Sequence, residues 1–223
     1  MERLELNDAS MGECVQRAAA VLARGGVIIY PTDTLYGLGA DAFSDEAVGA
    51  VYAIKGRNEN KPIHCVVADM EMAGRYAEVS DDARLLAKEF FPGALTLVLS
   101  AKGGSASGGK KKPEFGHGIG RYRNTIGIRI PDNEFCLSLA REFGQPFTTT
   151  SANAAGKPHA FSINGILEQL GAVAARIDLT VDAGDILPRM ASTVVDLSGE
   201  EPVILREGAI PVADVWNAIR AEA

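Results

Sequence analysis

The 223-residue chain has little of what marks secreted or membrane proteins. It has only three cysteines (Cys14, Cys65 and Cys136), an odd number that is too widely spaced for a disulfide framework. No apolar run approaches the roughly 20 residues that a membrane-spanning helix needs, and the first residues lack the pattern of a signal peptide. We therefore expect a cytoplasmic protein with no membrane partner.

Aromatic residues and positive charge are also scarce. Aromatic residues make up 6% of the sequence, and 22 lysines and arginines stand against 29 acidic residues, for a net charge of −7. A surface that coats nucleic acid needs excess positive charge, and single-strand binders use aromatic rings as stacking platforms. With 47% apolar and 23% charged residues, the composition is that of an ordinary globular protein.

Several familiar catalytic motifs are absent. There is no Gly-x-x-x-x-Gly-Lys-Ser/Thr phosphate loop and no Gly-x-Ser-x-Gly nucleophile elbow. His64 and Cys65 are neighbours in a predicted strand and would point to opposite faces, so we expect no protein zinc site. Gly37, Gly39 and Ala42 imitate a dinucleotide fingerprint, but six residues separate Gly37 from the preceding strand, which disfavours that function.

Short apolar strands alternate with amphipathic helices. Strands are predicted at about 27–30, 63–68, 95–99, 125–130, 147–151, 177–181, 193–197 and 202–206. Helices are predicted from about 10 to 24, from about 44 to 55, and at 80–90, 132–143, 162–170 and 211–220. Ser10 and Glu13 have the spacing of a capping box at the start of the first helix. The late strands lack intervening helices, so we expect an α/β fold with a mixed parallel and antiparallel sheet.

Positive charge gathers in one glycine-rich segment. Residues 101–124 contain six basic residues and one acidic residue, a net charge of +5 that leaves −12 for the remainder. Glycine and serine at this density disfavour a packed core. We predict a mobile basic surface loop within one domain rather than a linker between two.

Cations and hydroxyl groups gather where predicted helices and strands end. Lys55, Arg57 and Lys61 follow a helix, where cations either complement the helix dipole or form an anion clamp. The strand at 147–151 runs into Ser151 and Asn153, which either cap a turn or bind a polyanion. This inventory suits a protein that binds phosphates and positions reactants.

Two further features favour a binding site. Residues 31–40 place two threonines and an aspartate directly after a buried strand, which favours a site loop over a simple turn. Arg129 lies within a predicted strand, and a charge there is costly unless it meets an internal acid or a ligand carboxylate.

Ordered motifs from about Gly25 to Gly208 resemble those of the threonylcarbamoyl-AMP synthases, the YrdC/Sua5 family. They are Pro31-Thr-x-Thr-x-Tyr-Gly-Leu-Gly39, Lys55-x-Arg57 with Lys61-Pro62, Phe91-Pro-Gly-x-Leu-Thr96, the strand Thr125–Arg129, Ser151-Ala-Asn153, Ser192-Thr-Val-Val-Asp196 and Arg206-x-Gly208. The resemblance implies the short, single-domain form of the family over residues 1–223, with a twisted open sheet, flanking helices and a deep basic cavity.

The resemblance also implies an activity, that of a nucleotidyltransferase. L-Threonine, bicarbonate and ATP would give threonylcarbamoyl-AMP and pyrophosphate, with Mg²⁺ accompanying ATP as co-substrate. The product would feed the N6-threonylcarbamoyl modification of adenosine 37 in tRNAs that read ANN codons, through a downstream transferase machinery. The basic loop would then be a tRNA contact or a lid.

The resemblance assigns a role to each matching residue. The implied ATP-binding residues are Lys55, Arg57, Lys61, Thr125, Ser151, Asn153 and Arg206. The implied threonine-binding residues are Thr34, Arg129, Thr149 and Ser192, with Arg129 taking the carboxylate. No catalytic residue is distinct from these, since Lys55 and Arg57 would stabilise the phosphates electrostatically. His159 stands where the family tends to have a small residue near the nucleotide.

Two alternatives remain open at this point. The first is an RNA-binding translation factor without catalysis, which the basic loop favours and the net negative charge disfavours. The second is a carbamoyl-adenylating relative with a different substrate, such as the carbamoyl-transferring module of hydrogenase maturation factors.

Overall fold

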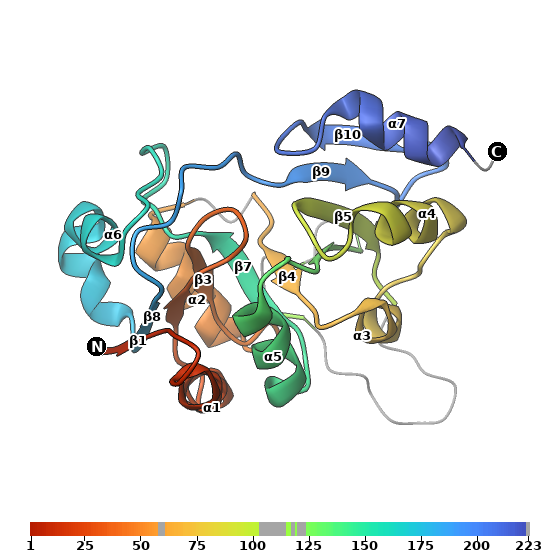
Figure 1. Ribbon diagram of the computed structural model, residues 1–223. Coiled ribbons are helices and arrows are strands. Elements are labelled where there is room, and N and C mark those ends of the chain that lie inside the picture. The colour runs from red at the N-terminus through yellow and green to blue at the C-terminus, as the bar shows by residue number, and fades with distance from the viewer. Residues whose placement is uncertain (58–60, 103–114, 117–118, 120–123, 222–223) are drawn as a thin grey trace, which may run out of the picture.

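Short β-branched and apolar segments form the strands of a mixed sheet in the computed structural model, which describes residues 1–57, 61–102, 115–116, 119 and 124–221 (Figure 1). The strands are β1 (Glu2–Glu5), β2 (Ile28–Tyr30), β3 (Gly37–Gly39), β4 (His64–Val66), β5 (Leu95–Ser100), β6 (Thr125–Arg129), β7 (Phe147–Ser151), β8 (Leu179–Asp182), β9 (Thr193–Asp196) and β10 (Val203–Arg206). The helices are α1 (Met11–Ala23), α2 (Asp45–Lys55), α3 (Met70–Tyr76), α4 (Asp81–Phe90), α5 (Glu134–Phe143), α6 (Ile163–Leu170), the 3₁₀ helix η1 (Gly171–Arg176) and α7 (Val212–Arg220).

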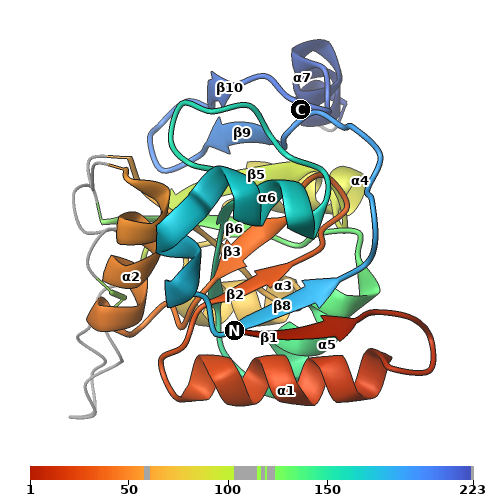
Figure 2. The same ribbon diagram turned by 90° about the vertical axis from the view of Figure 1, so that its left-hand side faces the viewer.

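The sheet mixes both strand directions, which confirms the predicted fold class. Its order across the described residues is β1-β8-β2-β3-β7-β4-β6-β5-β9-β10. The pairs β1–β8, β2–β8, β4–β6 and β5–β9 are parallel, and the other neighbouring pairs are antiparallel. Strands far apart in sequence therefore become neighbours, for example β3 and β7 (Figure 1) and β1 and β8 (Figure 2).

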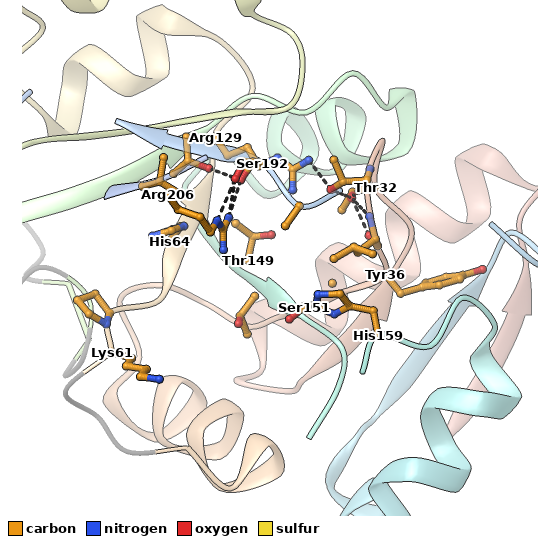
Figure 3. Close-up of a pocket in the computed structure, with 18 of the residues that line it drawn as sticks. Thr32, Tyr36, Lys61, His64, Arg129, Thr149, Ser151, His159, Ser192 and Arg206 are labelled. Atoms are coloured by element: carbon orange, nitrogen blue, oxygen red, sulfur yellow. Dashed lines mark hydrogen bonds between the residues drawn. The ribbon is translucent and has the colours of Figure 1, made fainter. Parts of the chain in front are cut away.

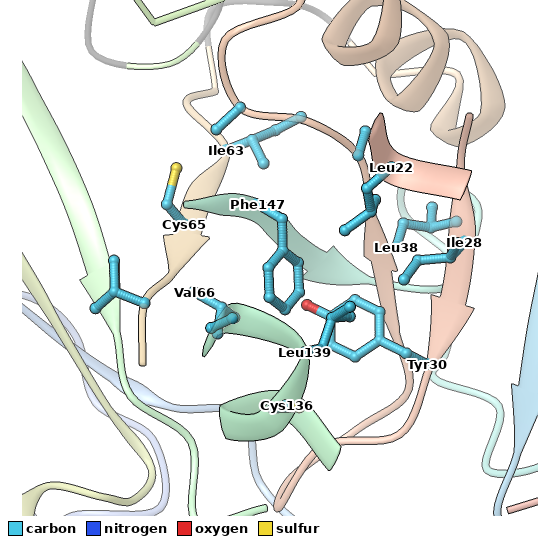
Figure 4. Packing of buried hydrophobic residues seen from close by; sticks show 14 of the residues in the cluster. Leu22, Ile28, Tyr30, Leu38, Ile63, Cys65, Val66, Cys136, Leu139 and Phe147 are labelled. Atoms are coloured by element: carbon cyan, nitrogen blue, oxygen red, sulfur yellow. The ribbon is translucent and has the colours of Figure 1, made fainter. Parts of the chain in front are cut away.

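Helices cover the sheet and enclose its apolar core. Helix α1 packs against α5, and α4 packs against α7. Between α5 and the strands, the rings of Tyr30 and Phe147 meet edge to face with their centroids 5.4 Å apart, beside Leu139 and Cys136 (Figure 4). All four of these side chains are buried, so this core fixes the positions of β2 and β7, whose ends reach the functional site.

Some predicted local details are wrong or incomplete. Helix α1 forms as predicted, but Ser10 makes no capping bond with its side chain, because its hydroxyl donates to the Glu5 carbonyl at 2.6 Å instead. The elements β1, β3, α3 and η1 were not predicted, since they are short and lack a clear apolar period. The predicted basic loop falls largely on residues 103–114, 117–118 and 120–123, which lie outside the described residues.

The two glycines of β3 allow close packing against an aromatic ring. Gly37 and Gly39 lie against the ring of Tyr30, and a β-carbon added at either position would stand 2.9 Å from a ring carbon. The two glycines therefore serve close packing within the sheet, not a dinucleotide-binding turn. Within the described part of the chain, no helix has the length and apolar character to cross a membrane.

We predict that Gly39→Ala destabilises the fold. The added methyl group would meet the Tyr30 ring and Ile28, and such overpacking costs about 1–3 kcal/mol. The matched control is Gly49→Ala in α2, where nothing lies within 4 Å of the added carbon. That change should stabilise by about 0.5–1 kcal/mol because alanine favours helix. Urea unfolding measures both, and equal stability of the two variants would contradict this account of β3.

Candidate functional site

A cavity of about 470 Å³ opens where the ends of several strands meet (Figure 3). Its lining is mainly cationic and hydroxyl-bearing, and none of the described residues that line it is acidic. The lining residues are Thr32, Thr34, Leu35, Tyr36, Gly37, Arg57, Lys61, Pro62, His64, Thr96, Arg129, Thr149, Thr150, Ser151, His159, Ala191, Ser192, Val194, Leu205 and Arg206. The cavity is thus suited to an anionic ligand.

Lys55 is buried beside the cavity and holds the turn that follows β7. At the end of α2, its ammonium donates to the carbonyl oxygens of Ser151 and Asn153 at 2.5 and 2.9 Å and to the Asn153 side-chain oxygen at 3.2 Å. Burial, together with the nearby charge of Arg57, lowers the pKa of Lys55 to about 8. The ammonium has three donors, so all of them are used by the protein.

Arg57 faces the cavity because the chain turns at Gly56, whose φ of 58° lies in the left-handed region. Its guanidinium donates to the Thr150 hydroxyl at 3.4 Å and to the Pro62 carbonyl at 3.2 Å. Its Nε is buried and has no hydrogen-bond partner among the described residues. Burial also lowers the pKa of Arg57, so an anion at this point would supply a missing acceptor and offset the cost of the buried charge.

The turn after β7 is held from within. The Ser151 hydroxyl donates to the Asn153 side-chain oxygen at 2.6 Å, and the Asn153 amide donates to the Lys157 carbonyl at 2.7 Å. Ser151 lines the cavity, whereas Asn153 is buried behind it. Together with Lys55, Asn153 therefore shapes the turn that presents Ser151.

On the opposite wall, Arg129 meets an internal acid. Its guanidinium donates to Asp33 at 2.5 Å and to the Thr34 hydroxyl at 2.7 Å, and the side chains of Arg129 and Asp33 are only 8% and 7% exposed. Arg129 also has a buried Nε to which no residue in the described part of the chain is hydrogen-bonded. The loop that carries Asp33 is folded by Thr32, whose hydroxyl accepts from the amides of Thr34 and Leu35 at 3.1 Å.

Arg206 reaches the cavity from β10 and is bonded to Ser192. The pairing of β10 with β9 shifts register between Ile204 and Arg206, and an irregularity of this kind changes the direction of the side chains that follow. Two guanidinium nitrogens donate to the Ser192 carbonyl at 3.1 and 2.7 Å, and one of them also approaches the Ser192 hydroxyl at 3.2 Å (Figure 3). Gly208 permits this close approach, since a β-carbon there would stand 2.2 Å from the Ala191 carbonyl oxygen.

Two histidines line the cavity and were not assigned a role from the sequence. His64 lies on β4 beside Gly127 of β6, where an added β-carbon would stand 2.5 Å from the imidazole. Burial lowers the pKa of His64 to about 4, and the charges of Arg206, Arg57 and Arg129 contribute. The imidazole is therefore neutral at neutral pH. The signal that could have found His64 is the alternation of side chains along a strand. Because Cys65 is buried on one face of β4, its neighbour His64 points to the opposite face, toward the site.

His159 lines the cavity wall with much of its side chain exposed, and the partial burial of the imidazole and the charges of Lys55 and Arg206 lower its pKa. The resemblance places His159 near the nucleotide, and the structure places it beside the cavity.

Most of the sequence-predicted site residues converge on this cavity. Those that line it are Thr34, Arg57, Lys61, Arg129, Thr149, Ser151, Ser192 and Arg206. Lys55 and Asn153 support it from behind, whereas Thr125, at the start of β6 opposite Ser100, does not line it. No cluster of three or more metal-ligating His, Cys, Asp or Glu residues occurs within the described ranges.

Comparison with known proteins connects this geometry to a family. The Sua5/YciO/YrdC family model, described as telomere recombination, matches residues 20–208. The chain is 35% identical over 206 residues to a putative threonylcarbamoyl-AMP synthase of Mycobacterium leprae, covering 92% of this chain and 87% of the relative. It is 32% identical over 206 residues to the threonylcarbamoyl-AMP synthase of Pyrococcus abyssi, covering 92% of this chain but only 57% of that longer protein.

Solved structures agree. The crystal structure of P. abyssi Sua5 complexed with L-threonine matches with a TM-score of 0.83 and 30% identity, covering 98% of this chain and 60% of that one. Escherichia coli YciO matches with a TM-score of 0.78 and 25% identity, covering 95% of this chain and 96% of that one. The matched sequence, fold and motif order have a single explanation: the chain belongs to the Sua5/YciO/YrdC family.

Proposed function

We propose that this protein is a threonylcarbamoyl-AMP synthase that converts L-threonine, bicarbonate and ATP into threonylcarbamoyl-AMP, pyrophosphate and water. The single observation that carries the proposal is the convergence of Arg57 and Ser151 with Arg129 and Ser192 on one cationic cavity. The names of the relatives and the threonine-bound P. abyssi structure support the same activity. At about 470 Å³, the cavity is within the range of small-molecule sites.

The reaction joins a carbamate oxygen to the α-phosphorus of ATP. The bond between the α-phosphorus and the bridging oxygen to the β-phosphate breaks, and both electrons of that bond leave with pyrophosphate. Negative charge therefore grows on the leaving group, and fixed cations facing it lower the barrier. Arg57 and Lys61 are placed for this role, with Arg206 and the Ser151 hydroxyl completing the nucleotide side.

Lys55 has a different task in this proposal. Because its ammonium already bonds to three oxygens of the 151–153 turn, we assign it to holding Ser151 and Asn153 in place. Of the residues proposed for ATP, Thr125 has the weakest support, because it lies outside the cavity lining.

The amino-acid side of the cavity is organised by Arg129. One edge of its guanidinium is neutralised by Asp33, and its Nε, which has no partner among the described residues, would donate to the threonine carboxylate. Thr34, Thr149 and Ser192 place three hydroxyl groups around the same space. With both substrates held in one cavity, the carbamate and the α-phosphate are brought together, which removes much of the entropic cost of their encounter.

Mg²⁺ enters this scheme as part of the ATP substrate. The described lining offers hydroxyl groups but no carboxylate, and Mg²⁺ is commonly bound through substrate phosphates. Mg²⁺ would assist the departure of pyrophosphate by neutralising phosphate charge.

The proposal also includes a location in the cytoplasm. The three cysteines are buried free thiols, which suits the reducing cytoplasm. We also propose that the product passes to a transferase that modifies adenosine 37 of tRNA, and that the basic segment 101–124 contacts tRNA. The non-catalytic RNA-binding alternative is not favoured, because it gives no role to the cationic cavity.

The first prediction concerns substrates. Purified protein should release pyrophosphate from ATP only when L-threonine and bicarbonate are both present. Replacing threonine with serine or with carbamoyl phosphate distinguishes a relative with a different substrate, and omitting the amino acid tests for simple ATP hydrolysis. Salt-dependent tRNA binding with no threonine-dependent pyrophosphate release would contradict the proposal in favour of the RNA-binding alternative.

The second prediction concerns the phosphate clamp. Arg57→Ala should lower threonine-dependent pyrophosphate release at least about a hundredfold, the scale for losing one electrostatic stabiliser. The control is Arg84→Ala, whose side chain is 68% exposed on α4 and lies outside the cavity lining. Unfolding curves should show both variants folded, and unchanged turnover of Arg57→Ala would remove Arg57 from the site.

The third prediction concerns pH. His64 has its pKa lowered from 6.5 to about 4 by folding, so between these values the unfolded chain binds more protons than the folded one. Stability contributed by neutral His64 is therefore complete above pH 6.5 and is lost as the pH falls, by about 1–3 kcal/mol near pH 4. Urea unfolding across this range should show a shallower acid slope for His64→Gln. An identical slope in the variant would refute the low pKa.

A further inference from the structure

Strand β5 contains a polar residue, Thr96, between the apolar residues Leu95 and Leu97. It reads Leu95-Thr-Leu-Val-Leu-Ser100, and the side chain of Thr96 is fully buried although it reaches the cavity lining. A buried hydroxyl is costly unless it is hydrogen-bonded. Within the described structure, the Oγ1 of Thr96 and the Oγ of Ser192 are hydrogen-bonded to each other at 2.9 Å. Thr96 is therefore tied to a residue of the proposed threonine site.

Ser192 is held from the other side by Arg206. The guanidinium donates to the Ser192 carbonyl at 3.1 and 2.7 Å, and it approaches the Ser192 hydroxyl at 3.2 Å. A guanidinium can only donate, so in that contact the Ser192 oxygen accepts. The direction of the remaining bond, between Ser192 and Thr96, then decides where the Ser192 proton points.

Only one direction leaves that proton available to a ligand. If Ser192 donated to Thr96, its proton would point toward β5. If Thr96 donates, the Ser192 oxygen accepts from both Thr96 and Arg206, which uses its two acceptor sites, and its own proton is free toward the cavity. A carboxylate can only accept hydrogen bonds, so a bound amino acid favours the second arrangement.

We propose that Thr96 is a positioning residue for the amino-acid subsite, because its hydroxyl donates to Ser192 and turns the Ser192 proton toward the bound threonine. This inference rests on the proposed function, which places threonine at Ser192. Since Arg206 belongs to the nucleotide side, Ser192 is clamped between groups that serve the two substrates.

Two substitutions at Thr96 separate the hydroxyl from the shape of the side chain. Thr96→Val keeps the branched shape and loses the hydroxyl, whereas Thr96→Ser keeps the hydroxyl and loses a methyl group. Loss of one hydrogen bond corresponds to about a two- to tenfold change in affinity. We therefore expect Thr96→Val to raise the KM for threonine by about two- to tenfold, with kcat and the KM for ATP nearly unchanged. Thr96→Ser should stay close to wild type.

Titration calorimetry with L-threonine supplies a readout that does not depend on turnover. The dissociation constant of threonine should rise for Thr96→Val by the same factor as its KM. Thr96→Ala gives a second variant without the hydroxyl, so the comparison survives if Thr96→Val does not fold. The matched control is Thr180→Val on β8, because Thr180 is equally buried, lies outside the cavity lining and bonds to the Glu2 carbonyl at 3.3 Å. Threonine affinity of the folded control should not change.

The outcomes distinguish this inference from the proposed function. Threonine-dependent wild-type activity with an unaffected Thr96→Val would overturn the role of Thr96 alone. Weakening by Thr96→Ser as strong as that by Thr96→Val would also overturn it, because shape and not the hydroxyl would then matter. A wild-type protein that neither binds threonine nor needs it for pyrophosphate release would overturn the proposed function and this inference together.

Discussion

The fold holds three guanidinium groups of like charge close together, because all three face one cavity. Arg57, Arg129 and Arg206 repel one another, and their charges act together on His64, whose pKa they help to lower. Burial and the other two arginines lower the pKa of Arg206 as well. Like charges stay together only where a rigid framework holds them, so the rest of the site can be understood as that framework.

Each cation is held by oxygen atoms from a different part of the chain. Arg129 is paired with Asp33, Arg206 is bonded to Ser192, and Lys55 is bonded to the turn after β7. Within the part of the chain that the structure describes, Arg57 and Arg129 nevertheless each retain a buried Nε without a partner. The fold therefore holds the cations in place but leaves part of their hydrogen-bonding capacity unused, as a site for an anionic substrate requires.

Buried and partly buried hydroxyl groups also hold the loops and side chains of the site in place. Thr32 folds the loop that carries Asp33, and Ser151 is fixed by Asn153. The hydroxyl of Thr96 is likewise hydrogen-bonded to the hydroxyl of Ser192. A hydroxyl both donates and accepts, so in a crowded cationic site it can link a guanidinium to a neighbouring group without adding charge.

The local sequence determined the positions of most helices and long strands and the order of the site motifs. Apolar periodicity and glycine or proline boundaries located most of the helices and long strands, because these signals act over a few residues. The ordered motifs also identified most of the residues that line the cavity. The short strands β1 and β3 were not predicted because partners distant in sequence stabilise them: β1 pairs with β8, and β3 pairs with β7.

Only the tertiary structure decided what each polar residue does. The sequence left Arg129 with either an internal acid or a ligand carboxylate, and the fold supplied Asp33. It could not show that Lys55 would turn inward to a backbone turn, that Thr125 would lie outside the cavity, or that His64 would face three arginines. A side chain's role depends on which partners come within about 3 Å, and those partners belong to strands that the mixed sheet brings together from distant parts of the chain.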